Sequence, residues 1–387
     1  MTIKVDVKFV VGLAVGAVVM AALAFLVVGL TGDDGDSKKA SDIGPVNSPG
    51  ASQDTGGDDE DNGKDDDEKS GGAQPGEPLA LPVPTGAGRI ECPNPTKTVG
   101  SAQELEQAVK GANAGDVIKM KPGTYQGKFV AQASGTAQQP IFLCGDPKSV
   151  IDGGGVKKGY ALHLNKASYW RLIGFTITNA QKGVMADTSN GSVIQGLEVH
   201  NIGDEAIHLR NFSTGNTVQY NKVYNTGMRR EKFGEGVYLG TAESNWKRFS
   251  GGKPDKSDNN VVRGNVIRAT AEAIDIKEGT SGGKILGNVF DGSKTGGDKF
   301  NDSWVDVKGN NYLIEGNTGT GTPMDGFQTH QIGKKDTGYG TGNVFRNNKI
   351  NLGGGKGAGI NDVAGGNKIE CNNQVTGGKL VAKGNCG

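Results

Sequence analysis

The feature that most constrains the fold is a short segment that recurs eight times between residues 171 and 375. Its copies are RLIGFTI (171–177), VIQGLEV (193–199), VQYNKVY (218–224), VRGNVI (262–267), ILGNVF (285–290), IEGNTG (314–319), FRNNKI (345–350) and IECNNQV (369–375). Equivalent residues in consecutive copies are 22 to 31 residues apart, except for one step of 44. This spacing indicates a repeat of about 23 residues with insertions, the longest of which is 241–260.

Each repeat contains a second segment in which apolar residues alternate with other residues, as in a β-strand. These segments are GVMAD, AIHLR, GVYLG, AIDIK, WVDVK, GFQTH and GINDV, and they begin at residues 183, 206, 236, 273, 304, 326 and 359. Their inward positions would be Val184, Ile207, Val237, Ile274, Val305, Phe327 and Ile360. Burial of such a side chain contributes roughly 1.5–3 kcal/mol, and one coil cannot enclose its own apolar face. The sequence therefore predicts an all-β protein, a parallel β-helix of about eight or more stacked coils.

Asparagine occupies one equivalent position in six copies of the repeat. These residues are Asn221, Asn265, Asn288, Asn317, Asn348 and Asn372. We interpret them as a ladder of hydrogen bonds at a turn of the stack, and we assign them no chemistry.

The outward side of the second segments carries like charges at equivalent positions. One column would be Met185, His208, Tyr238, Asp275, Asp306, Gln328 and Asn361, and the next would be Asp187, Arg210, Gly240, Lys277, Lys308 and His330. Stacked strands lie about 4.8 Å apart, and like charges directly opposite each other are unfavourable. The columns therefore indicate a functional site, although diagonal attraction between Asp and Lys would also permit a merely solvated face.

Both ends of the repeat region carry features that would close it. Residues 101–112 begin with a capping box, Ser101 and Glu104, and would form a short helix over the open end of the stack. Two of the four cysteines lie near each end of the folded region. The four are Cys92, Cys144, Cys371 and Cys386. Among the three possible pairings we favour Cys92 with Cys144 and Cys371 with Cys386, because each bond would hold one end of an elongated fold.

Residues 1–30 contain an uncharged, mostly apolar run from Phe9 to Leu30, long enough to cross a hydrocarbon core of roughly 30 Å. Lys4 and Lys8 precede the run, so we expect a single-pass signal-anchor with a cytoplasmic N-terminus and an extracellular folded domain. The alternative is a cleaved signal peptide, since residues 22–24 (Ala-Leu-Ala) resemble a cleavage site, and the domain would then be secreted.

Residues 31–88 are rich in Gly, Ser, Pro and acidic side chains and contain few large apolar residues, so we predict a disordered linker. The folded domain, 89–387, holds 36 Lys and Arg against 27 Asp and Glu, a net charge of +9. This excess favours an anionic partner. The charge alone does not name that partner. We do not expect a nucleic acid, and we expect a monomeric protein.

The stretch from Ser101 to Gly155 contains GDVIKMKPGTYQGKF at 115–129, followed by PIFLCGD and SVIDGGG. This stretch resembles right-handed parallel β-helix proteins of the pectin-lyase-like superfamily. It is similar above all to polysaccharide lyases such as chondroitinase B and alginate lyases. The resemblance in pattern covers about residues 97–387 and implies the right hand of the helix. It also implies cleavage of a uronic-acid polymer by β-elimination, which requires a base and neutralisation of the sugar carboxylate.

In these lyases a calcium-binding acid precedes the base lysine by five residues, and an arginine follows on the next coil. Glu272 and Lys277 match the first pair, and Lys308 stands at the place of the arginine. The sequence departs from the pattern at Val307-Lys308-Gly309, which replaces Arg-His-Gly, and at Thr270, where a second acid is expected. The resemblance implies Lys277 and Lys308 as catalytic residues and a calcium ion. The candidate metal ligands are Glu235, Glu272, Asp275 and Asp306.

Further side chains are candidates for substrate binding because they fall on the outward columns or have a ring that stacks on sugars. They are Arg210, His208, His330, Tyr238 and Trp304. Two other functions compete with a lyase. Asp275 and Asp306 could act as the paired carboxylates of a glycoside hydrolase, or the domain could be a noncatalytic envelope protein that binds an anionic glycan.

Overall fold

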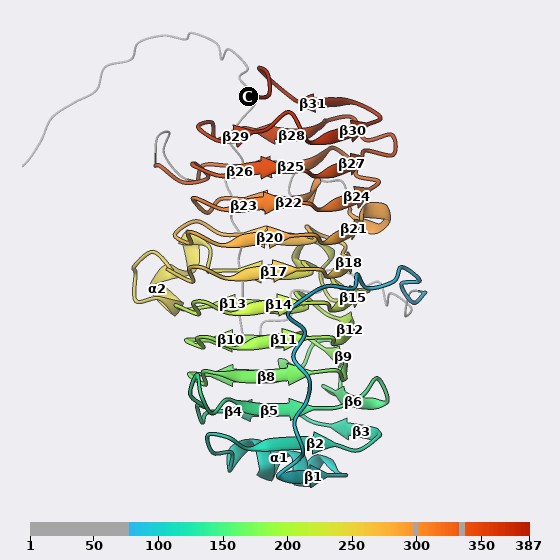
Figure 1. Ribbon diagram of the computed structural model, residues 1–387, viewed down its shortest axis with the longest axis vertical. Coiled ribbons are helices and arrows are strands. Elements are labelled where there is room, and N and C mark those ends of the chain that lie inside the picture. The colour runs from blue at the N-terminus through green and yellow to red at the C-terminus, as the bar shows by residue number, and fades with distance from the viewer. Residues whose placement is uncertain (1–76, 297–300, 333–336) are drawn as a thin grey trace, which may run out of the picture. The chain divides into compact units, whose positions relative to one another are not determined.

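The computed structural model describes residues 77–296, 301–332 and 337–387. Within these residues the chain winds through three parallel sheets of 11, 10 and 10 strands (Figure 1). Each strand pairs with the equivalent strand of the next coil, so neighbours in a sheet are distant in sequence. The predicted parallel β-helix, with more than eight coils, is confirmed.

We name the sheets A, B and C. Sheet A contains β1 (Lys97–Val99), β2 (Val117–Met120), β5 (Ile141–Cys144), β8 (Trp170–Ile173), β11 (Val193–Gln195), β14 (Thr217–Gln219), β17 (Val261–Arg263), β20 (Lys284–Leu286), β23 (Leu313–Glu315), β26 (Val344–Arg346) and β29 (Lys368–Ile369). Sheet B contains β3 (Gly123–Gln126), β6 (Ser149–Asp152), β9 (Thr176–Ala180), β12 (Glu198–Ile202), β15 (Lys222–Tyr224), β18 (Val266–Arg268), β21 (Val289–Asp291), β24 (Thr318–Thr320), β27 (Lys349–Asn351) and β30 (Gln374–Thr376). Sheet C contains β4 (Phe129–Ala131), β7 (Tyr160–Asn165), β10 (Lys182–Asp187), β13 (Ile207–Arg210), β16 (Val237–Leu239), β19 (Ile274–Ile276), β22 (Ser303–Val307), β25 (Asp325–Thr329), β28 (Ala358–Asp362) and β31 (Lys379–Val381).

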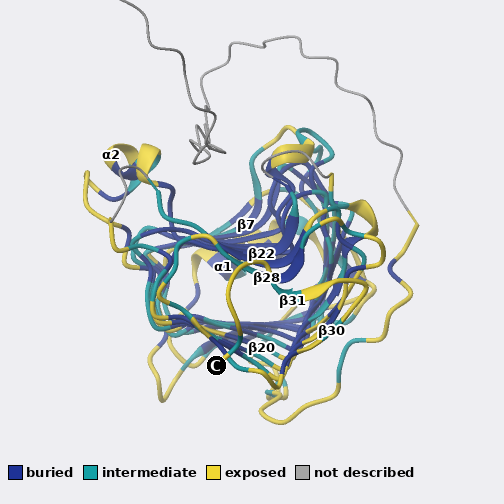
Figure 2. Ribbon diagram, turned by 90° about the horizontal axis from the view of Figure 1, so that it is seen from above, coloured by how far each residue is buried: buried dark blue, intermediate teal, exposed yellow. Residues whose placement is uncertain are grey.

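The hydrophobic core fills the inside of the coils. The inward column predicted for sheet C is fully buried from Val184 to Ile360, and its members pair in register from strand to strand. Figure 2 shows the buried strands around the interior and the exposed residues mainly in the connecting loops. The alternation of apolar residues therefore predicted the core face correctly.

The asparagine ladder is also present, with one correction. From Asn265 to Asn348, each side chain accepts hydrogen bonds from the backbone and side-chain amides of the preceding asparagine, as Asn288 does from Asn265 at 3.0 and 2.9 Å. Asn221 accepts from the Leu197 backbone amide at 2.9 Å. At the last rung Asn348 donates to Asn373 at 2.8 Å, whereas Asn372 is exposed. The prediction of Asn372 was wrong by one residue, because the pair Asn372-Asn373 offered two asparagines at the expected spacing.

Helix α1 (Ala102–Lys110) packs against β1, β2, β3 and β4 at one end of the stack, as predicted. The Ser101 hydroxyl accepts from the Glu104 amide at 3.2 Å, and the Glu104 carboxylate accepts from the Gly100 amide at 2.6 Å. Leu105 and Val109 are buried in the core. The helix therefore covers apolar side chains of the first coil that no further coil protects.

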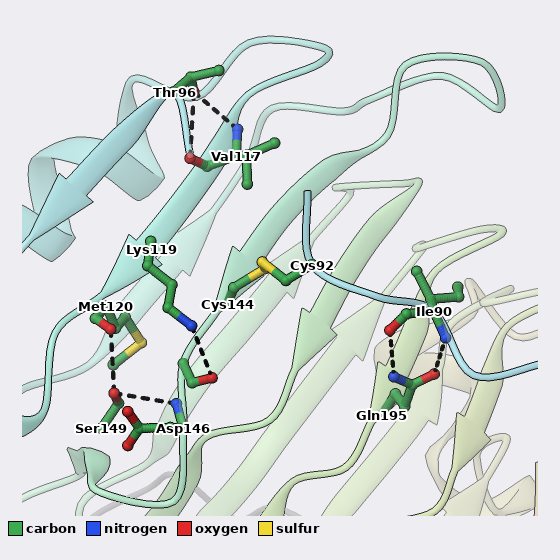
Figure 3. The surroundings of a disulfide bond; sticks show 11 residues. Ile90, Cys92, Thr96, Val117, Lys119, Met120, Cys144, Asp146, Ser149 and Gln195 are labelled. Carbon is green, nitrogen blue, oxygen red and sulfur yellow. Dashed lines mark hydrogen bonds between the residues drawn. A yellow bond between two sulfur atoms is a disulfide. The ribbon is translucent and has the colours of Figure 1, made fainter. Parts of the chain in front are cut away.

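The cysteines form the two disulfides that we favoured, Cys92–Cys144 and Cys371–Cys386. Cys92 joins the N-terminal segment to β5 near one end of the stack, and Figure 3 shows it beside the contact between Ile90 and Gln195. The Gln195 side chain donates to the Ile90 carbonyl and accepts from its amide, both at 2.8 Å.

The segment before Cys92 runs across the strands of sheet A, from coil to coil, in Figure 1. Leu79 is buried against Tyr224 and Val266, and the Tyr220 hydroxyl donates to the Ala87 carbonyl at 2.8 Å. The prediction that the linker extends to residue 88 is therefore wrong at its C-terminal end. Apart from prolines, its only large apolar residues after position 78 are Leu79, Leu81 and Val83, and sequence alone did not reveal a hydrophobic surface that would receive them.

The predicted membrane span at 9–30 and the rest of the predicted linker lie outside the described residues. Among the residues that the structure describes, no helix has the length and apolar character needed to cross a bilayer. The short helices besides α1 are α2 (Trp246–Phe249), η1 (Glu231–Phe233), η2 (Glu243–Asn245) and η3 (Gly292–Lys294).

The buried ladder predicts a large effect of Asn288→Ala on stability. The substitution leaves the Val262 carbonyl and the Asn265 amide groups buried without their partners, and each such group costs about 1–3 kcal/mol. We expect the free energy of unfolding, measured by chemical denaturation, to fall by about 3 kcal/mol. The control Asn372→Ala, at an exposed position, should change it by less than about 1 kcal/mol. Equal effects of the two substitutions would contradict the ladder.

Candidate active site

The pairing of β19 with β22 brings Asp275 directly beside Asp306 on the outer side of sheet C. Lys277 and Lys308 follow at the ends of the same two strands, where the Lys308 amide donates to the Ile276 carbonyl at 2.8 Å. The two outward columns predicted from the sequence are therefore present. Residues 31 positions apart in the chain have become nearest neighbours.

The like charges in these columns are separated by opposite charges. The Lys277 ammonium lies 2.8 Å from the Asp275 carboxylate, and the Lys308 ammonium lies 2.7 Å from Asp306 and 3.4 Å from Asp275. All four side chains are buried. The attraction within each strand, and between Lys308 and Asp275 across the strands, offsets the repulsion between identical neighbours. Because the groups are buried, water screens these interactions little.

His330 extends this network by one coil. Its Nδ1 lies 2.8 Å from the Asp306 carboxylate, and about a fifth of its side chain is exposed. Burial alone would lower the pKa of His330, but the Asp306 carboxylate outweighs burial and raises it. Burial alone would raise the pKa of Asp306, yet Lys308 and His330 hold that pKa well below its ordinary value.

Three buried carboxylates meet next to the lysines. Glu235, Glu272 and Asp275 each place an oxygen within 4.8 Å of the other two. Burial and the nearby charges of Asp275 and Asp306 raise the pKa of Glu272 well above its ordinary value. These three acids come from two coils and were all among the predicted metal ligands. Asp306, the fourth predicted ligand, lies outside this group and is bound by Lys308 and His330.

Tyr238 and His208 continue the column toward the N-terminal coils. The Lys277 ammonium lies 4.9 Å from the centre of the Tyr238 ring, and that ring lies 4.3 Å from the His208 ring. His208 is buried, and its Nε2 lies 2.9 Å from the Gly240 carbonyl oxygen. The prediction that His208 is an outward surface residue open to a sugar is therefore wrong.

Arg210 is likewise buried, and its side chain contacts other residues of the protein. Its Nε donates to Asp187 at 2.8 Å, and its guanidinium lies 3.8 Å from the centre of the Phe249 ring in α2. Helix α2 belongs to the insertion 241–260 and lies outside the coil in Figure 2. Arg210 thus supports the insertion, which corrects its predicted role as an open substrate-binding residue.

Trp304 does not face the site, so its predicted role in sugar stacking is wrong. Its indole is buried in the core against Phe290 and Phe327, with ring centres 6.2 and 6.0 Å away. The side chain turns inward near the start of β22 because Gly319 leaves the space: a Cβ at Gly319 would lie 2.3 Å from the indole.

Two buried carboxylates around this network were not selected from the sequence. Glu278, directly after Lys277, is buried, and its carboxylate accepts from the Glu243 amide in η2. Burial raises its pKa despite the nearby lysines. Asp302 lies just before β22, and burial raises its pKa to about 6. Glu278 occurs within the motif EAIDIKEG, but no pattern in the sequence indicates that the insertion folds back to bury it.

The His330–Asp306 contact predicts a titration that NMR can measure. Because Asp306 outweighs burial, His330 should titrate above its ordinary pKa, and Asp306→Asn should shift the pKa below that value. The ion pair stabilises the fold below the ordinary histidine pKa, and this contribution is lost as the pH rises through the raised pKa. His200 in β12, whose pKa burial lowers, serves as the unaffected control. An unchanged His330 titration in Asp306→Asn would contradict the electrostatic account.

Comparisons with known proteins agree with this architecture. The family model described as "Pel9A-like, right handed beta helix region" matches residues 93–237. The alginate lyase from Paenibacillus sp. str. FPU-7 is 34% identical, with a TM-score of 0.69, over 75% of this chain and 98% of that chain. No curated protein matches the chain.

Two more distant structures share the fold alone. Pectate lyase Pel9A is 14% identical, with a TM-score of 0.54, over 73% of this chain and 79% of that chain. The polygalacturonase from Erwinia carotovora ssp. carotovora is 12% identical, with a TM-score of 0.51, over 78% of this chain and 98% of that chain. With the match at 34% identity, these findings show that the chain belongs to the right-handed parallel β-helix proteins of the pectin-lyase-like superfamily.

Proposed function

We propose that this protein is a polysaccharide lyase that cleaves an anionic, uronate-containing polysaccharide by β-elimination. The observation that carries the proposal is the pairing of Lys277 and Lys308 with Asp275 and Asp306, next to the buried acids Glu235 and Glu272. The similarity at 34% identity to an alginate lyase supports the same class of substrate.

In such a reaction the base removes the proton from the carbon next to the sugar carboxylate. The electron pair of that C–H bond forms a C=C bond, and the glycosidic C–O bond breaks. We assign the base to Lys277, which must be neutral when the substrate binds. The positive charge of Lys308, on the neighbouring strand, favours the neutral form of Lys277, whereas Asp275 opposes it.

The leaving oxygen must receive a proton. Tyr238 lies beside Lys277 on the preceding strand and carries a hydroxyl that can donate one. We therefore assign Tyr238 to this step, in place of the role in substrate binding that the sequence suggested. His330 stays a proposed substrate-binding residue, because its side chain is partly exposed at the other side of the lysine pair.

Glu235, Glu272 and Asp275 fit a calcium ion. Calcium prefers oxygen ligands, and the three carboxylates lie within 4.8 Å of one another. Burial, together with the neighbouring charges of Asp275 and Asp306, raises the pKa of Glu272, and a bound cation would oppose this effect. When bound there, calcium would neutralise the carboxylate of the sugar. The Asp275 carboxylate would then interact with the ion in addition to Lys277. It would therefore stabilise the charged form of Lys277 less.

We also propose that the domain acts outside the cell, attached to the membrane through residues 9–30. The apolar run in that segment supports an anchor, and the two disulfides are typical of an exported protein.

The proposal predicts that Lys277→Ala strongly slows cleavage. Alginate, pectate and chondroitin should be offered with and without calcium, and the unsaturated uronate product followed by its ultraviolet absorbance. We expect at least one polymer to be cleaved. The substitution should reduce the rate by about a hundredfold to ten-thousandfold, the usual contribution of a general base.

The matched control is Lys284→Ala, which removes an exposed lysine from β20 on sheet A. It should leave the rate unchanged. Full activity of Lys277→Ala would show that the base is wrongly assigned. Binding of an acidic polymer without any cleavage would favour the glycan-binding alternative, and cleavage without an unsaturated product would favour a hydrolase.

The carboxylate cluster predicts that calcium stabilises the fold. At about a hundred times its Kd, a ligand that binds only the folded state adds about 2.7 kcal/mol to the free energy of unfolding. We expect a rise of this size in the parent protein and its loss in Glu272→Gln, measured by denaturation with and without calcium.

Glu231→Gln, at an exposed position in η1, is the control and should keep the stabilisation by calcium. If calcium stabilises Glu272→Gln as strongly as the parent protein, the ion binds elsewhere.

A further inference from the structure

A pair of arginines shares one buried carboxylate at the edge of sheet C. Asp204 is fully buried, and both Arg229 and Arg230 bind it. Arg229 donates from Nε at 3.2 Å and from a terminal nitrogen at 2.8 Å, and Arg230 does the same at 3.4 and 3.1 Å. The Gln181 side chain adds a further hydrogen bond at 3.1 Å.

This arrangement carries more positive charge than the carboxylate needs. One arginine would neutralise Asp204, so the second leaves a net charge of +1 within the group. The guanidinium groups remain partly open, since the side chains of Arg229 and Arg230 are 22% and 30% exposed. Each guanidinium has N–H groups that Asp204 does not use, and these are suited to a second carboxylate.

The fold holds both arginines in place before any ligand binds. The Arg229 amide donates to the Gly203 carbonyl at 2.8 Å, next to Asp204. On the other side, the Thr270 hydroxyl lies 3.0 Å from the Glu231 carbonyl and 3.3 Å from the Thr226 carbonyl, at either end of the arginine turn. Thr270 stands where the resemblance predicts an acidic ligand, and here it supports this turn.

The pair lies on the coils next to the proposed catalytic residues. Arg230 is five residues before Glu235, a member of the carboxylate cluster, on the segment that leads into β16. Ala206, which lies two residues after Asp204, donates from its backbone amide to the Glu235 carbonyl at 3.0 Å. The arginines thus stand at the edge where the chain enters sheet C, about one coil from Glu272.

We propose that Arg229 and Arg230 form a binding site for the carboxylate of a uronate unit outside the pair of sugars whose bond is cleaved. This inference rests on the proposed function for the identity of the polymer. The site would favour longer acidic chains over short ones, because only a longer chain reaches the arginines and the lysines together.

The test measures binding without cleavage, by calorimetry in the Lys277→Ala background. The probes are an alginate disaccharide, a longer alginate oligosaccharide and a neutral glucan of similar length. Arg229→Gln leaves Arg230 to neutralise Asp204 and keeps a side-chain donor, so the fold should persist; thermal denaturation checks this. We expect the longer oligosaccharide to bind about tenfold more weakly, equivalent to about 1.4 kcal/mol, with no change for the disaccharide or the glucan.

Lys232→Gln is the matched control, since it removes one exposed positive charge three residues away without touching Asp204. It should weaken binding far less than Arg229→Gln. Equal weakening by both variants, equal weakening for both alginate probes, or no binding of alginate by the background protein would overturn the inference. Unchanged binding in Arg229→Gln, together with intact cleavage when Arg229→Gln is made in the protein that keeps Lys277, would overturn the inference while leaving the proposed lyase function in place.

Discussion

The structure depends on the stacking of parallel strands, which turns a distance of 22 to 44 residues in the chain into one strand spacing. The apolar side chains inside the coil are protected only because another coil lies above and below them. The same stacking acts on the outer side, where it collects side chains from successive repeats into columns. The core and the site therefore share one cause: any slip in register that exposed Ile274 would also separate Asp275 from Asp306.

The electrostatics of the outer columns follow from this geometry. A parallel stack forces like residues together when repeats are similar. The buried lysines and aspartates are tolerated because each lysine pairs with the aspartate of its own strand, and Lys308 also contacts Asp275 on the neighbouring strand. The charges of these lysines and aspartates are therefore already paired within the protein. A polyanionic substrate then needs additional positive charge, and a cation at the three-carboxylate cluster and the arginine pair at the edge of sheet C are the two sources that we propose.

Sequence reasoning succeeded where period and alternation decide the outcome. The core column, the helix at the first coil, both disulfides and the Asp–Lys neighbours follow from counting residues within repeats. Sequence reasoning failed for side chains whose orientation or burial depends on a feature outside the repeat pattern. Trp304 turns into the core because a glycine on a neighbouring coil leaves room. Arg210 is buried under Phe249 of the insertion 241–260, and His208 is buried beside the Tyr238 ring. The contact between Arg229 and Asp204 was missed because Asp204 is 25 residues away and belongs to no repeated motif.

The most direct measurement is a crystal structure of Lys277→Ala with calcium and an uncleaved uronate oligosaccharide. The account predicts a sugar carboxylate at the ion held by Glu235, Glu272 and Asp275, with the adjacent C–H facing the position that the Lys277 ammonium vacates. An oligosaccharide bound on another sheet, or at the outer side of sheet C with its carboxylates turned away from these residues, would contradict it.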